Sequence, residues 1–475
     1  MSGKALAVKL DSPLPRSVPR GSATAVFCMG TASEGSAPVA DLELLVDGIG
    51  YPLEAVRMTR FDMPCRRSGF WGLVPFVGSA SAEHVELSAR VRGRDGAVEE
   101  VELGAVPIVD EPQPAGRGDR DALIAVCMAT FDPDPALLAR QLDSLRSQTD
   151  ARWTCVISDD HSSPERYATL TAMIGEDARF IASRSERRIG FYRNFERALR
   201  MAPPEAQLIA FCDQDDVWHP DKLAVLRGAI GSASLVYCDQ RLVDTAGRVL
   251  RKTLWQGRAN NSTNLASMLI ANTVTGAAAL FRQDVAERAL PFPDSPGIEF
   301  HDHWIALVAL AGGELRYVDR PLYDYVQHEG AILGKVAGQD GPADAGAGLG
   351  RLPRMRRWRA AYFLGYVPGK VRAETLRLRC GERMAPAKRR ALERYISSEH
   401  SLLGFAWLLL RPARALIGRN ETLAAEWELT RGIAWQRLAR AFARAPWPGR
   451  WTLDTRFPDP PHFQYRRLQR WRGRM

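Results

Sequence analysis

The segment FCDQDDVWHPDKL (residues 211–223) places three carboxylates, Asp213, Asp215 and Asp216, between an apolar strand-like run and a helix start. Like charges this close together repel one another unless a positive charge lies between them. Carboxylate oxygens are hard ligands, which favour Mg²⁺ or Mn²⁺ over softer metals. A divalent ion of this kind commonly bridges substrate phosphates, so the segment predicts a metal site that accepts a nucleoside diphosphate.

Two other apolar runs also end in polar residues. Thr130 and Asp132 lie at the end of the run that starts at residue 123, and Asp159 and Asp160 end WTCVISDD (153–160). In an open parallel sheet, ligands bind at the carboxyl ends of the strands, because loops and helix N-termini converge there. A single acid at such a position more often caps the next helix. The ISDD and DQDD segments together hold more carboxylates than capping requires, so a shared binding edge is predicted.

These acids fall where strand-like and helix-like patterns alternate. Continuous apolar runs near 123–131, 153–160 and 208–213 are typical of buried strands, and Pro135 marks the first turn of a helix between them. Strands that are buried on both faces and joined by helices usually run parallel. The alternation up to residue 213 therefore predicts a doubly wound α/β sheet, in a domain that spans residues 120–334.

Residues 1–110 have a different pattern, with short strands and turn residues. VELSARVR (85–92) alternates apolar and polar residues, and GRDGA (93–97) supplies an Asp-Gly hairpin turn. A small all-β sandwich is predicted, without residues that indicate chemistry. Phe70 and Trp71 suit either a β core or stacking on a sugar, and the core is the favoured interpretation.

Residues 351–475 are helical in pattern and rich in arginine and tryptophan. They hold 28 Lys and Arg against 9 Asp and Glu, whereas residues 1–350 hold 36 against 46. Flexible linkers are predicted at 111–121 and 335–350. The basic region suits a solvated face, an anionic membrane surface or nucleic acid. Nucleic acid is the least favoured partner, because apolar residues flanked by arginines cluster in 402–418.

The composition indicates an intracellular, multidomain protein. A chain of 475 residues is too long for one hydrophobic core. Its seven cysteines lack CxxC spacing, which predicts buried reduced thiols. The first residues lack the apolar core of a signal peptide, and SLLGFAWLLL (401–410) is too short to span a bilayer. The expected location is the cytoplasm, with any membrane contact being peripheral, on the inner face of the cell membrane.

Several ordered blocks resemble the successive motifs of family 2 glycosyltransferases, the inverting enzymes with the GT-A fold. The blocks are ALIAVCMATFDPDPALLARQLDSLRSQT (122–149), WTCVISDDHSS (153–163), RRIGFYRNFERAL (187–199) and LIAFCDQDDVWHPDKL (208–223). The DQDDVW block is most similar to the rhamnosyltransferase-like branch. The resemblance covers residues 122–334 and implies a GT-A core that binds a nucleotide sugar together with Mg²⁺ or Mn²⁺.

By position, the resemblance implies roles for single residues. Thr130 and Asp132 correspond to the loop that flanks the nucleotide base, and Asp160 corresponds to the acid that reads the base edge. Asp213 and Asp215 match the family's DxD pair, with Asp213 near the ribose and Asp215 on the metal. Both are therefore expected metal ligands.

The block HDHWIAL (301–307) resembles the one that carries the general base, which implies that role for Asp302. An acceptor hydroxyl must lose its proton as it attacks, and a carboxylate can take it. The alternative is that Asp302 is the N-cap of the helix that follows. His301 and His303 are not expected to bind zinc, because no third ligand accompanies them locally.

The block YDYVQHEGAILG (323–334) resembles the family's Gln-His segment after the last strand. It implies that His328 completes the metal shell or contacts the diphosphate. The chain departs from the family pattern at Ala331, where relatives often have asparagine.

Together, the acids and the resemblance imply an inverting glycosyltransferase. It would move a sugar, with rhamnose favoured, from a nucleoside diphosphate donor to a hydroxyl of a growing glycan or lipid-linked acceptor, in cell-surface polysaccharide synthesis. A metal-dependent nucleotidyltransferase is the alternative, although no basic glycine-rich loop for a triphosphate follows the first strand. A dehydrogenase is disfavoured because MATFDPDP stands where GxGxxG would lie.

Overall fold

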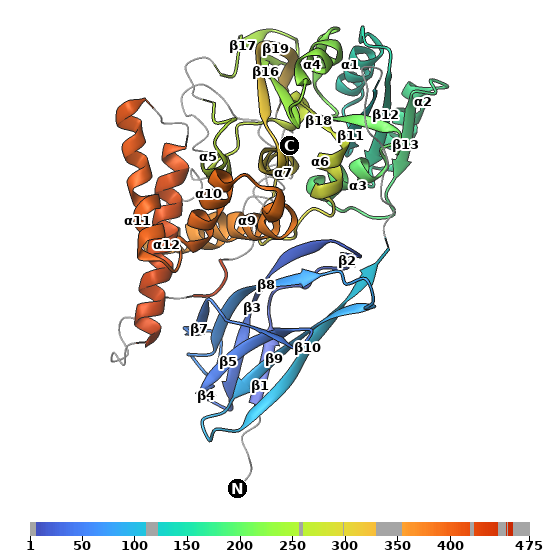
Figure 1. The fold of residues 1–475 in the computed structure, drawn as a ribbon. Helices are drawn as coiled ribbons and strands as arrows, with labels where there is room; N and C mark the ends of the chain where they lie inside the picture. The colour runs from blue at the N-terminus through green and yellow to red at the C-terminus, as the bar shows by residue number, and fades with distance from the viewer. Residues whose placement is uncertain are drawn as a thin grey trace, which may run out of the picture.

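Figure 1 shows a computed structural model of the chain, in which an all-β region, an α/β region and a group of C-terminal helices pack together. The structure describes residues 6–110, 122–255, 260–297, 299–328, 354–418, 422–444, 453 and 455–458. Both predicted linkers and Ala331 lie outside these residues. The predicted fold class is confirmed, an α/β core between an all-β region and a helical region. The exact domain boundaries stay a prediction.

The all-β region consists of two five-stranded sheets packed face to face. Its strands are β1 (Leu6–Leu10), β2 (Val18–Pro19), β3 (Ala23–Glu34), β4 (Ala37–Pro38), β5 (Asp41–Val46), β6 (Ile49–Tyr51), β7 (Ala55–Met58), β8 (Gly69–Val77), β9 (His84–Arg92) and β10 (Val98–Val109). One sheet has the order β1-β3-β8-β7 with β4 on β3, and the other has the order β2-β10-β9-β5-β6. Residues of β9 alternate between exposed and buried, and Gly96, at φ +88°, makes the turn into β10.

Two aromatic residues of β8 resolve the choice between core and sugar binding. Phe70 and Trp71 are both fully buried. The indole Nε1 of Trp71 donates a hydrogen bond to the hydroxyl of Tyr362, 3.1 Å away in the C-terminal helices. Neither ring can therefore stack on a sugar, and Trp71 joins two regions of the chain.

The α/β region is built around a nine-stranded sheet. Its elements are β11 (Leu123–Thr130), α1 (Pro135–Arg146), β12 (Trp153–Asp159), α2 (Pro164–Ile174), β13 (Phe180–Arg184), α3 (Phe191–Arg200), β14 (Ala206–Cys212), β15 (Val217–Trp218), α4 (Lys222–Ile230), β16 (Leu235–Asp244), β17 (Val249–Arg251), α5 (Leu265–Ile270), η1 (Gly276–Ala278), β18 (Ala279–Arg282), α6 (Gln283–Ala289), α7 (His301–Gly312) and β19 (Leu315–Gln327). The strand order is β13-β12-β11-β14-β18-β16-β19-β15, with β17 on β16.

The first half of this sheet is parallel, as predicted. β13, β12, β11 and β14 run in one direction, and the first strand in sequence lies between the second and the fourth. In such an open sheet, ligands bind in a crevice outside the carboxyl ends of the strands, at the point where the strand order reverses, which here lies between β11 and β14. Thr130, Asp159 and Asp213 lie at or directly after the carboxyl ends of these strands, so the residues singled out from the sequence share this edge.

The second half of the sheet, for which no strand direction is expected from the sequence, is mixed. β18 runs antiparallel to both of its neighbours, β14 and β16. A continuous apolar strand can be buried on both faces in either direction, so its composition does not encode its orientation.

The start of α1 illustrates how local sequence sets an element. The side chain of Asp134 accepts a hydrogen bond from the backbone N–H of Ala136 at 2.9 Å, and Pro135 follows at the first helical position. Leu138, Leu142 and Leu145 on one face are buried against the sheet. The helix therefore begins where the Pro135 signal places it.

The C-terminal region is helical where the structure describes it. Its elements are α8 (Arg354–Ala361), η4 (Tyr362–Tyr366), α9 (Val367–Cys380), η5 (Gly381–Arg383), α10 (Pro386–Ser397), α11 (Leu402–Leu410), η6 (Arg411–Ile417) and α12 (Leu423–Arg444). Their buried residues join the apolar core of the central sheet in one cluster. Among the described helices, none has the length and apolar character needed to cross a bilayer. All seven cysteines are buried and unpaired.

A buried ion network ties the C-terminal helices to the all-β region. The ammonium of Lys370 in α9, whose side chain is 3% exposed, pairs with Glu54 after β6 and with Glu399 at 2.8 Å. The hydroxyl of Tyr362 donates to Glu399 at 2.6 Å. Burial and the neighbouring charge of Glu399 raise the pKa of Glu54 to about 7, and Lys370 opposes that rise. One cation therefore holds two buried acids from different regions.

Lys370→Met is expected to lower the free energy of unfolding by about 3 to 5 kcal/mol, because it leaves two buried carboxylates without their cation. Urea denaturation followed by tryptophan fluorescence measures the change. The matched control is Lys252→Met at an exposed position, which should leave the urea midpoint unchanged. Equal midpoints for the two variants would show that the network does not hold the regions together.

Candidate functional site

The ends of β11 and β12 are held together by one buried acid. Thr130 and Asp159 are partners in the strand register, and the Thr130 hydroxyl donates to Asp159 Oδ2 at 3.0 Å. Asp159 Oδ1 accepts from the backbone N–H of Ser162 at 2.9 Å, and the residue is fully buried. The buried side chain of Asp159 therefore holds the end of β11 and the loop after β12 in place, and it is not exposed to a ligand.

Asp160 anchors the loop that leads into α3. Its two carboxylate oxygens accept hydrogen bonds from the backbone N–H groups of Ile189 at 2.6 Å and Gly190 at 2.9 Å. Burial raises the pKa of Asp160, and these two hydrogen bonds oppose that rise. The side chain is 2% exposed, so the base-reading role implied for it stays a prediction.

Asp132 is an exposed residue on the loop between β11 and α1. Its backbone has φ +39°, and its Oδ1 accepts from the backbone N–H of Ser163 at 2.9 Å, at the start of α2. This contact positions two of the loops at the edge relative to one another. The role of Asp132 beside a nucleotide base also stays a prediction.

Two residues that the sequence did not single out hold the same loop. Gln214, between the acids of the DxD pair, accepts from the backbone N–H of Phe131 at 2.8 Å and donates to its carbonyl at 3.3 Å. The guanidinium carbon of Arg188 lies 3.8 Å from the centre of the Phe131 ring. The feature of the sequence that could have pointed to Gln214 is its side-chain amide, which can donate and accept hydrogen bonds at the same time.

Four residues from three segments that are far apart in the sequence, Asp213, Asp215, Asp302 and His328, come together beyond the end of β14. Burial raises the pKa of Asp213 to about 7, and the negative charges of Asp215 and Asp302 contribute to this rise. The carboxylate Oδ2 of Asp215 lies 2.7 Å from the imidazole Nε2 of His328. This hydrogen bond raises the pKa of His328. The acids of residues 213–215, the first turn of α7 and the end of β19 therefore form one cluster.

Asp302 lies in the first turn of α7 and is not its N-cap, which is Phe300. Its carboxylate accepts from the backbone N–H of His303 at 2.6 Å, from the N–H of Gly276 and from the side chain of Asn272. Burial raises the pKa of Asp302 to about 6, and these hydrogen bonds limit the rise. Asn272 is a further residue that the sequence did not single out.

A buried lysine lies behind the acids. Lys222, the first residue of α4, is fully buried, with its ammonium 3.3 Å from the centre of the Trp218 ring. Burial lowers the pKa of Lys222 to about 8, and the charges of Asp213 and Asp216 oppose that fall. Asp216 accepts from the backbone N–H of Val326 at 3.3 Å, so it supports the strand that carries His328.

The two histidines beside Asp302 serve the core. His301 stacks on Phe195 with the ring centres 3.6 Å apart, and burial lowers its pKa to about 3. The Nε2 atom of His303 lies 2.6 Å from the carbonyl of Met268. Within the described part of the chain, neither histidine belongs to a group that could hold a metal ion.

Among the described residues, a single group of acids and histidine has ligand atoms close enough together to share a metal ion, and it lies away from the acids beyond β14. It consists of Glu54, Glu399 and His400. The ammonium of Lys370 already pairs with both carboxylates. This cluster is therefore the ion network that joins the regions.

The acids beyond β14 suit a divalent cation by the chemistry of their side chains, but the ligand atoms of Asp213, Asp215 and His328 do not all lie within 4.8 Å of one another in this structure. Asp213, Asp215 and His328 offer carboxylate oxygens and one imidazole nitrogen, a donor set that suits Mg²⁺ or Mn²⁺. The mutual repulsion that raises the pKa of Asp213 would be relieved by a doubly charged ion. The chemistry of these residues thus fits the predicted metal.

Residues 125–290 match the family model described as glycosyl transferase family 2, which is about a third of the chain. The match confirms the predicted resemblance over this segment, and the rhamnosyltransferase-like branch stays a prediction. Asp213 and Asp215 lie inside the matched residues, whereas Asp302 and His328 follow them. No residue of the all-β or the C-terminal region is included.

A curated relative from Sinorhizobium fredii, the uncharacterized protein y4gI, is 30% identical over 129 residues. The alignment covers 26% of this chain and 14% of that protein, so the chain spans a small part of its relative.

Two solved structures resemble the chain at low identity. The S. aureus TarS 1–349 complex with UDP-GlcNAc is 13% identical, with a TM-score of 0.41, over 71% of this chain and 97% of TarS 1–349. The mannosyltransferase PcManGT from Pyrobaculum calidifontis, in complex with GDP-Man and Mn²⁺, is 18% identical, with a TM-score of 0.36, over 70% of this chain and 90% of its own. At these scores the likeness gives no support to a functional assignment.

His328→Ala is expected to weaken Mn²⁺ binding in the presence of a nucleoside diphosphate by at least about tenfold, because it removes the imidazole donor beside Asp215. Isothermal titration calorimetry measures the affinity. His84→Ala, at an exposed position of the all-β region, is the control and should bind Mn²⁺ as the unmodified protein does. Unchanged affinity in His328→Ala would exclude His328 from the metal shell.

Proposed function

We propose that the protein is an inverting glycosyltransferase that uses a nucleoside diphosphate sugar and transfers the sugar to a hydroxyl group. The observation that carries the proposal is the cluster of Asp213, Asp215, Asp302 and His328 at the carboxyl edge of a sheet whose first half has a nucleotide-binding strand order. The match of residues 125–290 to a glycosyltransferase family supports the same reaction class.

In this proposal, the donor lies along the carboxyl ends of β11, β12 and β14. The nucleoside is placed beside Thr130, Asp132 and Asp160, and the diphosphate beside the DxD pair. Asp213, Asp215 and His328 would hold Mg²⁺ or Mn²⁺, and the bound ion would neutralise negative charge on the diphosphate leaving group.

Asp302 acts as the general base. Its carboxylate takes the proton of the acceptor hydroxyl, whose oxygen forms a bond to the anomeric carbon while the bond from that carbon to the diphosphate oxygen breaks. A single displacement inverts the configuration of the anomeric carbon. The hydrogen bonds from Asn272 and Gly276 fix the direction in which the carboxylate points.

The environment of Asp302 suits this role. A carboxylate with the usual pKa is a weak base near neutral pH, and catalysis improves as the pKa approaches the working pH. Burial brings the pKa of Asp302 to about 6, which leaves the group ionised at neutral pH and more basic than an exposed aspartate.

The identity of the donor sugar and of the acceptor forms a finer part of the proposal. Rhamnose from deoxythymidine diphosphate rhamnose is favoured by the DQDDVW resemblance alone. A growing glycan or lipid-linked acceptor in cell-surface polysaccharide synthesis is favoured on the same ground.

The test of the reaction class is product analysis by mass spectrometry. The protein is incubated with Mn²⁺ and a panel of nucleotide sugars that includes deoxythymidine diphosphate rhamnose. Release of nucleoside diphosphate supports glycosyl transfer. Release of pyrophosphate from nucleoside triphosphate and sugar phosphate would instead support the alternative, a nucleotidyltransferase.

Asp302→Asn is expected to lower sugar transfer by about 10²- to 10⁴-fold, because the amide cannot accept the acceptor's proton. Donor binding, followed as thermal stabilisation by the nucleotide sugar, should be retained. Asp143→Asn, whose side chain is 74% exposed on α1, is the matched control and should keep full activity. Near-normal turnover in Asp302→Asn would contradict the assignment of Asp302 as the general base.

The rate of transfer is expected to depend on pH through Asp302. Below a pH of about 6 the carboxylate is protonated and cannot act as a base, so kcat/KM should fall about tenfold for each pH unit. Above that pH the rate should reach a plateau. A rate that stays flat well below pH 6, in a protein whose fold is intact by circular dichroism, would contradict the assignment.

A further inference from the structure

Helix α11 exposes an apolar face. All nine of its residues, LLGFAWLLL, lack charge. Leu402 and Leu403 are 77% and 84% exposed, and Leu409 and Leu410 are 45% and 67% exposed. Residues separated by seven lie on the same face of a helix, so these four leucines form one stripe. The outward side of a surface helix normally carries polar residues.

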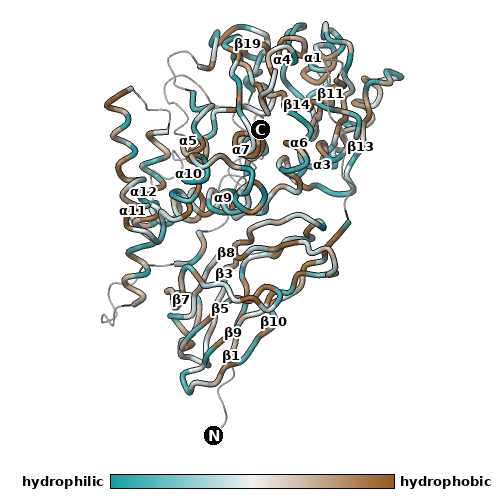
Figure 2. Tube along the Cα trace, viewed as in Figure 1, coloured by the Kyte–Doolittle hydropathy of each residue, from teal (hydrophilic) through white to brown (hydrophobic). Residues whose placement is uncertain are grey.

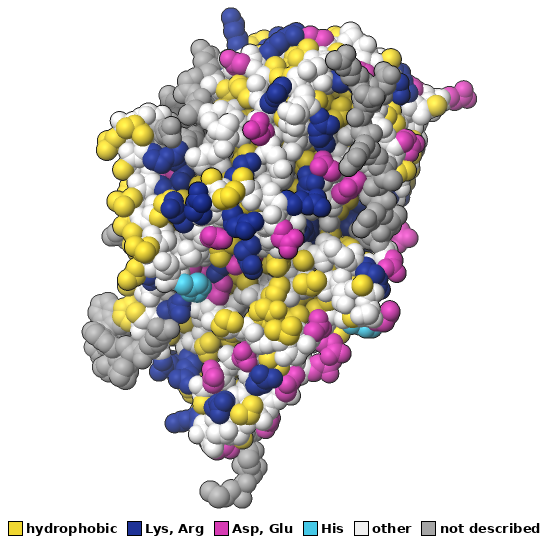
Figure 3. Space-filling model, in the orientation of Figure 1, with side chains coloured by type: hydrophobic (Ala, Val, Ile, Leu, Met, Phe, Trp, Pro, Cys, Tyr) yellow, Lys and Arg dark blue, Asp and Glu magenta, His cyan; other side chains and the backbone are white. Residues whose placement is uncertain are grey.

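The apolar stripe continues into η6. Leu416 is 88% exposed and Ile417 is 72% exposed. We call the six residues Leu402, Leu403, Leu409, Leu410, Leu416 and Ile417 the leucine ridge. Figure 2 shows α11 towards the hydrophobic end of its scale, and Figure 3 shows hydrophobic atoms along the edge of the molecule where α11 lies. Such a patch marks an interaction surface.

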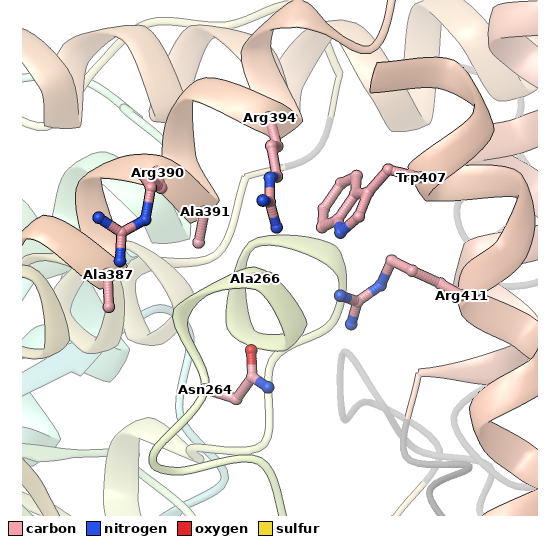
Figure 4. Close-up of a pocket in the computed structure, with 8 residues that line it drawn as sticks. All are labelled: Asn264, Ala266, Ala387, Arg390, Ala391, Arg394, Trp407 and Arg411. Atoms are coloured by element: carbon pink, nitrogen blue, oxygen red, sulfur yellow. The ribbon is translucent and has the colours of Figure 1, made fainter. Parts of the chain in front are cut away.

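A basic cavity lies beside the leucine ridge. It has a volume of about 380 Å³. Figure 4 shows side chains from three elements around it, from α5, α10 and the α11–η6 segment. Its polar and aromatic lining consists of Asn264, Arg390, Arg394, Trp407 and Arg411. Two of its three guanidinium groups, those of Arg390 and Arg394, are exposed, and they suit an anion with several oxygens, such as a phosphate.

The arginines of the cavity have different surroundings. Arg411 is 7% exposed and donates to Glu426 at 2.8 Å and to Ser267 at 2.9 Å. Arg390 and Arg394 are exposed on α10, and in the described part of the chain no ion pair engages them. Arg411 thus builds the wall, while Arg390 and Arg394 present charge to the outside.

The charge around the leucine ridge is mainly positive. α10 carries Lys388, Arg389, Arg390 and Arg394 against the single acid Glu393. Residues 400–418 contain no Asp or Glu. Figure 3 shows dark-blue side chains next to the hydrophobic edge. An apolar stripe bordered by arginines is complementary to a surface that is apolar inside and anionic outside.

We propose that the leucine ridge and the basic cavity form a docking surface for an anionic lipid bilayer. The leucine side chains enter the boundary between headgroups and acyl chains, and Arg390 and Arg394 contact lipid phosphates at the cavity. α11 is nine residues long, about 14 Å at 1.5 Å per residue, so it lies on the bilayer and does not cross it. This proposal does not depend on the proposed reaction.

Two other occupants are less compatible with the surface. A second copy of the chain would bring the arginines beside one leucine ridge against those beside the other, and the leucine ridge contains no acid that could pair with them. A nucleic acid would meet the arginines but would leave the aliphatic leucines in water. The bilayer satisfies both features at once.

The test is flotation of the full-length protein with vesicles of phosphatidylcholine alone and with added phosphatidylglycerol. Point variants are used because the C-terminal helices share a core with the central sheet, so a truncation would expose that core. The protein is expected to float with the anionic vesicles and to lose about fivefold in affinity for each arginine removed from the surface.

The first variant replaces Leu402, Leu403, Leu409 and Leu410 by serine, and it should lose at least about tenfold in affinity for the anionic vesicles. Its matched control is Ile49→Ser with Leu250→Ser, at positions 61% and 59% exposed elsewhere on the surface. The second variant is Arg390→Glu with Arg394→Glu, and its control is Arg92→Glu with Arg94→Glu on the all-β region. Both controls should float as the unmodified protein does.

Several outcomes would overturn the proposal. The first is flotation of the serine variant equal to that of its control. The second is a dimer of the unmodified protein that the serine variant converts to a monomer in light scattering, without vesicle binding, because the ridge would then contact a second copy. The third is inorganic phosphate that stabilises the protein through Arg390 and Arg394 while vesicles do not bind, because the cavity would then serve a soluble anion.

Discussion

The repulsion among carboxylates at one edge of the central sheet constrains the site more than any other interaction. Asp213, Asp215, Asp216 and Asp302 come from two elements, and burial weakens the ability of water to screen them. Such a cluster is unfavourable unless protons or cations offset it. A protein keeps such a costly group of charges where chemistry requires it.

Two neighbouring side chains, Lys222 and His328, offset the negative charge of the acids in different ways. Lys222 supplies a fixed positive charge from behind, held by the rings of Trp218 and Tyr323 and by the carbonyl of Ala277. The imidazole of His328 contacts Asp215 and can exchange its proton. A buried lysine cannot leave, whereas a histidine can give way to a metal, so the outer side of the cluster is the side on which ligands would bind.

The sequence was sufficient for the features that local chemistry determines. The alternation in β9, the Pro135 start of α1 and the buried parallel strands β11, β12 and β14 follow from side-chain pattern alone. The antiparallel placement of β18 did not follow, since an apolar strand of four residues carries no sign of its direction. The family resemblance was needed to connect Asp302 and His328 with the DxD pair, because they are separated from it by many elements. Gln214, Asn272 and Lys222 were missed because their roles consist of contacts with backbone or with distant acids, which only the folded chain reveals.

The position of His328 has a consequence for how a substrate would be received. It is the first residue after β19, a strand of thirteen residues that pairs along most of its length with β16. Its backbone is therefore held by the sheet. The carboxylate of Asp216 also accepts a hydrogen bond from the backbone N–H of Val326, near the end of that strand. A group fixed in this way loses little conformational freedom when it takes hold of an incoming molecule. One wall of the crevice is thus preorganised, and the entropy lost on binding falls mainly on the substrate.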